Sequence, residues 1–167
     1  MVIDNLHLFL RVSDVLTDLI VELKRQDAID KVRAFTSFSM DKYPHLSAYQ
    51  RLITSCSISD FQFYVGQTSK QLKCRSLTGP EKLKLFHAIN VKELLPSLDD
   101  NKVLKMQQLW NRLLRLNKIF SKRASDLSSS DIENFEDEAR SWGQLFISVY
   151  HDSHVTPYIH AMINHVS

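Results

Sequence analysis

Hydrophobic residues recur at steps of three and four along three long stretches of the chain, and polar residues fill the positions between them. In the first stretch the repeat is carried by Phe9, Val12, Leu16 and Leu19. This spacing is typical of helices that bury one face. It predicts long helices at about 5–25, 101–122 and 131–152, and shorter ones at about 28–39, 46–55, 80–90 and from Pro157 onward. The fold class is therefore mainly α, a bundle of five to seven helices packed around the three long ones.

The segment around residues 61–76 has a different pattern. Phe61, Phe63 and Val65 alternate with polar residues, a turn-like run from Gly66 follows, and the alternation resumes at Leu72. Two alternating runs joined by turn residues predict one small β-hairpin near residues 61–76, with a basic face.

Helix starts are marked by capping residues. Thr78 is followed by Pro80 and Glu81, which predicts a helix that begins at Pro80, because these residues satisfy the free amides of a first turn. Ser130 and Glu133 have the same spacing and predict a second capping box.

The bulk properties indicate one folded body. A chain of 167 residues, 44% of them hydrophobic and 24% charged, has the length of one domain and is too apolar for a disordered tail. We expect a single helical domain over residues 1–167. No apolar run approaches the roughly 20 residues of a membrane span, and the N-terminus lacks the pattern of a secretory signal. We therefore expect an intracellular protein without a membrane partner, in which Cys56 and Cys74 are free thiols.

The net charge of +2 conceals an asymmetry. Residues 1–124 hold 20 Lys and Arg against 12 Asp and Glu, a charge of +8, whereas residues 125–167 hold 1 against 7, a charge of −6. Basic residues and aromatic rings are interleaved on the predicted hairpin and the helix after it. Such a surface can contact nucleic acid through phosphates and bases, or it can be a solvated face beside a small core. The candidate DNA-binding residues are Lys70, Lys73, Arg75, Lys82 and Lys84. The aromatic residues interleaved with them are Phe61, Phe63 and Tyr64.

The familiar enzyme classes receive no support from sequence motifs. The chain has no G-x-S-x-G and only 3 Gly, which leaves little room for a phosphate-cradling loop. The C-terminal histidines lack the i, i+4 spacing of a helical zinc pair, which favours surface or packing roles. These histidines are His151, His154, His160 and His165. We expect no bound cofactor.

Asp4 and His7, three positions apart at the head of the first long helix, have two interpretations. Asp4 can cap the helix, with His7 at its third position. Alternatively, the short apolar strand Val2-Ile3 delivers a carboxylate that helps to hold Mg²⁺.

Three stretches of the chain resemble a family of proteins. The stretches are VIDNLHLFLRVSDVL, LKCRSLTGPEKLKLF followed by KVLKMQQLWNRLL, and VTPYIHAMINHV. They are similar to transposon-derived proteins of invertebrates and fungi, which are related to cut-and-paste transposases with an RNase-H-like core. The resemblance implies a catalytic site of three acids and two Mg²⁺ ions, in which Asp4 and His7 match the second acid and the His three residues after it.

The resemblance also implies an order of segments and two departures. Residues 1–25 are then a core helix after a strand remnant, 26–129 an insertion-like helical region with the hairpin, and 130–167 returning helices. The chain begins almost at the second acid and stops before the segment that carries the third. We therefore expect a derivative truncated at both ends that does not cut DNA alone, because two-metal catalysis needs all three acids.

Two hypotheses for function follow. In the first, the chain is a transposase fragment or degenerate derivative, nuclear in location, with a basic surface that binds DNA without sequence preference. In the second, it is a helical interaction module that joins missing parts of a larger chain or a second copy through the seam residues Phe135, Trp142 and Phe146.

Overall fold

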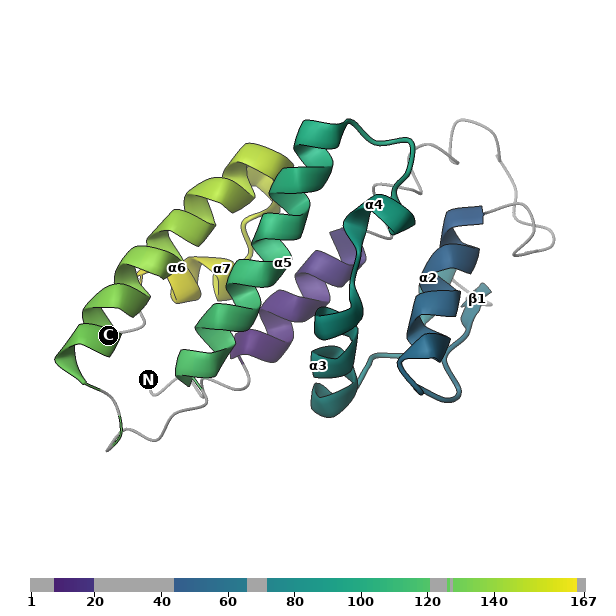
Figure 1. Cartoon of the computed structure of the whole chain (residues 1–167), viewed down its shortest axis with the longest axis horizontal. Helices are drawn as coiled ribbons and strands as arrows, with labels where there is room; N and C mark the ends of the chain where they lie inside the picture. Colours follow the sequence, from purple (N-terminus) through teal and green to yellow (C-terminus); the bar gives the residue numbers. More distant parts are fainter. Residues whose placement is uncertain (1–7, 20–43, 66–71, 121–125, 127, 165–167) are drawn as a thin grey trace. The chain divides into compact units, whose positions relative to one another are not determined.

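The computed structural model of the chain describes residues 8–19, 44–65, 72–120, 126 and 128–164 (Figure 1). Helices account for most of these residues, which confirms the mainly α fold class. The helix predicted at 28–39, both ends of the helix predicted at 5–25 and the turn at 66–71 lie outside the described residues. None of the helices in the described part is both long and apolar enough to cross a bilayer.

The described residues divide into two compact units. Unit 1 consists of the described residues up to Ser13 and those from Pro96 onward, and unit 2 consists of those from Asp14 to Leu95. The helical segment 8–19 contributes to both. The single domain over residues 1–167 stays a prediction.

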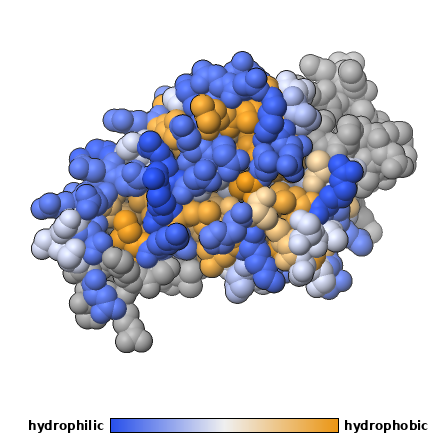
Figure 2. All heavy atoms as spheres, viewed as in Figure 1, coloured by the Kyte–Doolittle hydropathy of each residue, from blue (hydrophilic) through white to orange (hydrophobic). Residues whose placement is uncertain are grey.

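Unit 1 is built on two long helices, α5 (Asp100–Phe120) and α6 (Ser129–Tyr150), which lie side by side and run antiparallel (Figure 1). Their apolar stripes meet, and the indole Nε1 of the fully buried Trp142 donates a hydrogen bond to the Leu109 carbonyl at 2.9 Å. The short η3 (Asp152–His154) and α7 (Pro157–Asn164) follow and pack against α6. In the view of Figure 2, hydrophilic residues cover much of the surface over α5 and α6.

The start of α6 corrects a prediction. The capping box is made by Ser128 and Asp131 rather than by Ser130 and Glu133. The Ser128 amide donates to the Asp131 carboxylate at 3.1 Å, and the Asp131 amide donates to the Ser128 hydroxyl at 3.1 Å. Three consecutive serines allow several starts, and the earlier one extends the helix while still satisfying its first amides. Ile132, within the helix predicted at 131–152, is 46% exposed.

Unit 2 contains α2 (Pro44–Ser55), the strands β1 (Phe63–Val65) and β2 (Leu72–Cys74), α3 (Gly79–Ala88) and α4 (Val91–Leu94). The strands form the predicted antiparallel hairpin, in which Tyr64 pairs with Lys73. The predicted helix start after Thr78 is confirmed, because the Thr78 amide donates to the Glu81 carboxylate at 2.7 Å.

The helix predicted at 80–90 ends earlier than expected. The chain is extended at Ile89, and Asn90 then caps the separate turn α4, its side-chain oxygen accepting from the Lys92 and Glu93 amides. Asn90 followed three residues later by Glu93 is itself a capping signal, so this break is encoded locally.

Candidate nucleic-acid interface

The predicted DNA-binding residues lie on two elements of unit 2. Lys73 is the central residue of β2, Arg75 follows the strand, and Lys82 and Lys84 are on α3. Lys70 lies outside the described residues. Arg75, Lys82 and Lys84 differ in what their side chains contact, which decides how each can be used.

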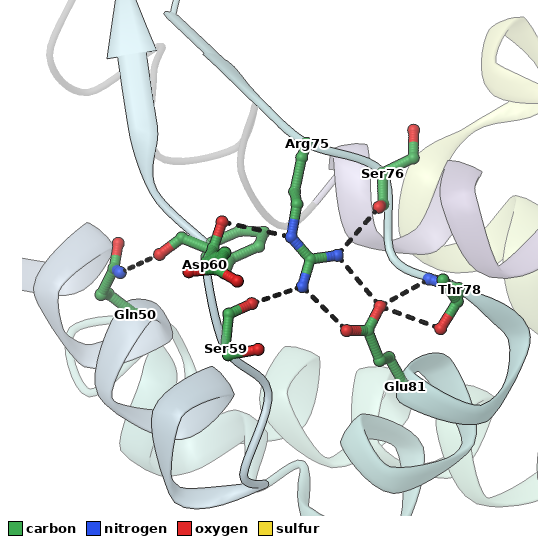
Figure 3. Close-up of polar contacts among 8 residues, drawn as sticks. Gln50, Ser59, Asp60, Arg75, Ser76, Thr78 and Glu81 are labelled. Atoms are coloured by element: carbon green, nitrogen blue, oxygen red, sulfur yellow. Dashed lines mark hydrogen bonds and ion pairs between the residues drawn. The ribbon is translucent and has the colours of Figure 1, made fainter.

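Arg75 is the centre of a polar cluster (Figure 3). Its guanidinium donates to both carboxylate oxygens of Glu81, at 2.8 and 3.0 Å. It also donates to three backbone carbonyls, those of Ser59 at 2.6 Å and of Asp60 and Ser76 at 3.2 Å. A planar guanidinium can make this set of bonds at once, whereas a lysine ammonium cannot. Arg75 therefore joins the loop before β1, the end of β2 and the start of α3.

Glu81 holds the other half of this cluster. Its carboxylate accepts from Arg75 and also from the amide and hydroxyl of Thr78 (Figure 3). Hydrogen bonds from Arg75, followed by the one from the Thr78 amide, lower the pKa of Glu81 to about 2. The carboxylate thus stays charged at neutral pH and serves both as the helix cap and as the partner of Arg75.

Lys82 is also committed to an internal contact. Its ammonium lies 2.6 Å from a carboxylate oxygen of Asp14, and its side chain is only 7% exposed. An ammonium removed from water in this way needs its partner, because an unpaired buried charge is strongly destabilising. The pair joins the helical segment 8–19 to α3 within unit 2.

Lys84 and Tyr64 are the accessible members of the predicted set. Lys84 is exposed and makes no ion pair among the described residues. Tyr64 is 50% exposed, and the register places Lys73 directly opposite it, so that the two positions belong to one face of the hairpin. Phe61 and Phe63 are buried instead, which corrects their interpretation as exposed stacking rings.

The buried face of the hairpin explains that correction. Phe61 and Phe63 pack edge to face with ring centroids 5.3 Å apart, and Tyr49 of α2 lies 6.0 and 6.1 Å from the two rings. Burial raises the pKa of Tyr49 well above its usual range. The alternation predicted two faces correctly, but only packing against α2 decided which face is buried.

The two cysteines are free thiols, as predicted. Burial, followed by the charges of Asp18 and Asp14, raises the pKa of Cys74 to about 11. A thiol with such a pKa is almost entirely protonated at neutral pH and is a poor nucleophile.

A cleft between α2 and α4 was not anticipated from the sequence. It has a volume of about 270 Å³, and the exposed residues Arg51 and Glu93 line it. Its remaining lining residues are Ala48, Leu52, Ser55, Asn90 and Leu94. Residues from both elements come together only through helix packing, so no local pattern marks the cleft.

The predicted metal and seam residues have different outcomes. Asp4, His7 and His165 lie outside the described residues. Within the part of the chain that the structure describes, no group of three His, Cys, Asp or Glu side chains could hold a metal ion. The seam residues Phe135, Trp142 and Phe146 are at most 5% exposed. They are covered within the chain, so their assignment to an interface with another chain is wrong.

No family model, curated protein or solved structure matches the chain. The relationship to transposases is therefore not shown by these comparisons and stays a prediction.

Proposed function

We propose that this chain is a non-catalytic derivative of a transposase-like protein that binds DNA without sequence preference. The resemblance and the charge of +8 over residues 1–124 support the proposal. Phosphate contacts supply most of the affinity in binding of this kind, and they require cations that are free to reach the backbone of the nucleic acid.

The observation that carries the proposal is the composition and exposure of the hairpin. Residues 61–77 contain three basic residues and no acidic one. Tyr64 is half exposed opposite Lys73, and Lys84 is exposed on α3. Lys73 and Lys84 are the proposed phosphate contacts, whereas Arg75 and Lys82 support the fold that presents them.

A binding titration tests the proposal. The intact chain is titrated against a fluorescently labelled duplex of arbitrary sequence, and anisotropy is followed from about 50 to 200 mM salt. Lys73→Ala and Lys84→Ala should each weaken binding to every sequence alike and reduce the salt slope by about 0.9, the value of one phosphate contact.

Two controls sharpen the result. Lys118→Ala removes the same charge from an exposed position of α5 in unit 1 and should change binding less. Arg75→Ala is unsuitable as the primary test, because it removes the hydrogen bonds to Glu81. A weaker binding of this variant could then result from partial unfolding as well as from a lost phosphate contact. No binding at about 50 mM salt, where phosphate contacts are strong, contradicts the proposal.

The catalytic part of the proposal concerns Asp4 and His7. These are the only residues of this chain that the resemblance assigns to a two-metal site, and Mg²⁺ is implied by the resemblance alone. We propose that this chain does not cut DNA and that supercoiled plasmid stays intact in Mg²⁺ or Mn²⁺. Nicking that disappears in Asp4→Ala would overturn this statement.

A second candidate function is that of a helical interaction module, and it requires exposed residues in place of the buried Phe135, Trp142 and Phe146. Four of the large hydrophobic side chains exposed in the described part belong to unit 1. They are Leu104, Ile132, Ile147 and Tyr158. This function requires an oligomer whose mass by light scattering rises with concentration and falls in Ile132→Lys or Ile147→Lys. A monomer at every concentration counts against self-association.

A further inference from the structure

We propose that the hairpin prefers single-stranded DNA to duplex DNA and that the ring of Tyr64 is the stacking platform for a base. This inference rests on the proposed function and names the form of nucleic acid that the same site takes. It starts from the contrast among three neighbouring aromatic residues. Phe61 and Phe63 are 5% and 8% exposed, whereas Tyr64 is 50% exposed.

The buried aromatic residues fix the backbone that carries Tyr64. Phe63 precedes it directly on β1 and is held between Phe61 and Tyr49, at centroid distances of 5.3 and 6.1 Å. Successive side chains of a strand point to opposite faces, so anchoring Phe63 inward directs Tyr64 outward. The strand therefore presents the exposed ring from a packed support.

Polar contacts fix the base of the same hairpin. Arg75 follows β2 and donates to the carbonyls of Ser59 and Asp60, which precede β1 (Figure 3). The side chain of Gln50 on α2 donates to the Phe61 carbonyl. Both chain segments that lead into the hairpin are thus tied to helices, which lowers the entropy that Tyr64 loses when it binds a ligand.

The chemistry of a half-exposed phenol beside a lysine position favours unpaired bases. A tyrosine face stacks on any base, and an ammonium neutralises the neighbouring phosphate. In a duplex the base faces are already stacked on one another, so only the phosphates remain available to this hairpin. Single-stranded DNA offers both contacts, which predicts the preference.

Competition between two forms of the same sequence tests the inference. The intact chain is titrated with a labelled single strand and with its duplex at one salt concentration. The single strand should bind more tightly. Tyr64→Thr keeps strand propensity but removes the ring, and it should lower single-strand affinity about 5- to 100-fold while leaving duplex affinity unchanged. Tyr64→Phe should keep the affinity, because it keeps the stacking face.

The outcomes separate this inference from the proposed function. Gln108→Thr, which changes an exposed side chain of α5 in unit 1, is the control and should bind like the unchanged protein. Salt-sensitive duplex binding that equals single-strand binding and is unaffected in Tyr64→Thr overturns the inference alone. Absence of binding to either form overturns both. A single-stranded RNA of the same sequence that binds more tightly than the DNA overturns the assignment to DNA.

Discussion

The two units of the molecule hold their elements together by different means. In unit 1, α5 and α6 meet along stripes of large apolar side chains, and the polar pairs Arg112–Ser141 and Arg115–Glu138 lie at the edge of that seam. In unit 2, short helices and a short hairpin pack around buried apolar side chains such as Tyr49, Phe61 and Phe63, and two ion pairs, Arg75 with Glu81 and Lys82 with Asp14, also connect the elements. Ion pairs with little exposed side chain thus supplement apolar packing in unit 2, whereas the ion pair between α5 and α6 in unit 1, Arg115–Glu138, involves a more exposed arginine.

Basic residues that form internal contacts are less available to a partner than exposed ones. In unit 2, Arg75 and Lys82 are committed to internal contacts, whereas Lys84 is exposed. A count of basic residues in the sequence does not distinguish these two groups. A mutational study of DNA binding that begins with Arg75 or Lys82 would measure unfolding together with binding.

A substitution of Trp142 should have the largest effect on the free energy of unfolding, and it tests the apolar packing between α5 and α6 in unit 1. Trp142→Ala should lower the free energy of unfolding by about 3–5 kcal/mol, because it removes a fully buried indole and leaves a cavity. Urea unfolding followed by circular dichroism measures the change. Trp142→Phe, which keeps a ring but loses the bond to the Leu109 carbonyl, should cost less. Equal losses in the two variants would show that the hydrogen bond rather than apolar packing holds the seam.

Lys82 is the corresponding residue of unit 2. Lys82→Ala should lower the free energy of unfolding by about 2 kcal/mol, since it removes a charged hydrogen bond and leaves the part-buried carboxylate of Asp14 without this partner. The double variant Lys82→Met with Asp14→Asn should recover part of the loss by keeping the buried stem. Single variants that unfold like the unchanged protein would show that this pair does not support α3.

The lowered pKa of Glu81 predicts that the free energy of unfolding depends on pH. Its folded pKa of about 2 lies below the ordinary value of 4.5, so its stabilising contribution is complete above about pH 4.5 and is lost as the pH falls through about 2. The difference in unfolding free energy between the unchanged protein and Glu81→Gln should shrink over this range. Asp137→Asn, at a side chain of 86% exposure, is the control and should give a small, flat difference.

Two residues with positive φ give the smallest expected effects. Ser57 (φ 55) lies just beyond the end of α2, where the Ile58 amide donates to the Ile53 carbonyl at 3.4 Å and the Ser57 amide donates to the Thr54 carbonyl at 3.0 Å. Glycine is favoured at this position of the Schellman motif, so Ser57→Gly should raise the unfolding free energy by about 0.5–1 kcal/mol.

His151 is the equivalent test in unit 1. Its φ of 66 and ψ of 164 form a backbone conformation that is almost confined to glycine. His151→Gly should therefore stabilise the protein by about 1 kcal/mol in thermal or urea unfolding. A loss of stability in either variant would mean that the side chain makes a contact worth more than the backbone strain.

Much of the fold was predictable because its signals are local. Hydrophobic residues at steps of three and four predicted α5, α6 and the helical segment 8–19. Thr78 and Glu81 predicted the start of α3. The alternation at Phe61, Phe63 and Val65 placed β1. Boundaries failed where several residues compete for one role, as at the serines before α6, or where a second cap restarts a helix, as at Asn90.

The candidate site was only half predictable. Composition located the basic residues on the hairpin and α3, but their partners lie far away along the chain. Lys82 meets Asp14, and Arg75 reaches back to Ser59 and Asp60. The exposed face of the hairpin likewise follows from the position of Tyr49 rather than from the strand itself.

The helical class, the hairpin and most helix starts could be predicted from the sequence, because hydrophobic periodicity and capping act between residues a few positions apart, and the excess of positive charge over residues 1–124 follows from composition. The accessibility of each lysine and arginine, and the aromatic ring that faces outward, depend on the folded structure. Burial and ion pairing require contacts between segments that are distant in the sequence, and a periodic pattern carries no information about those contacts.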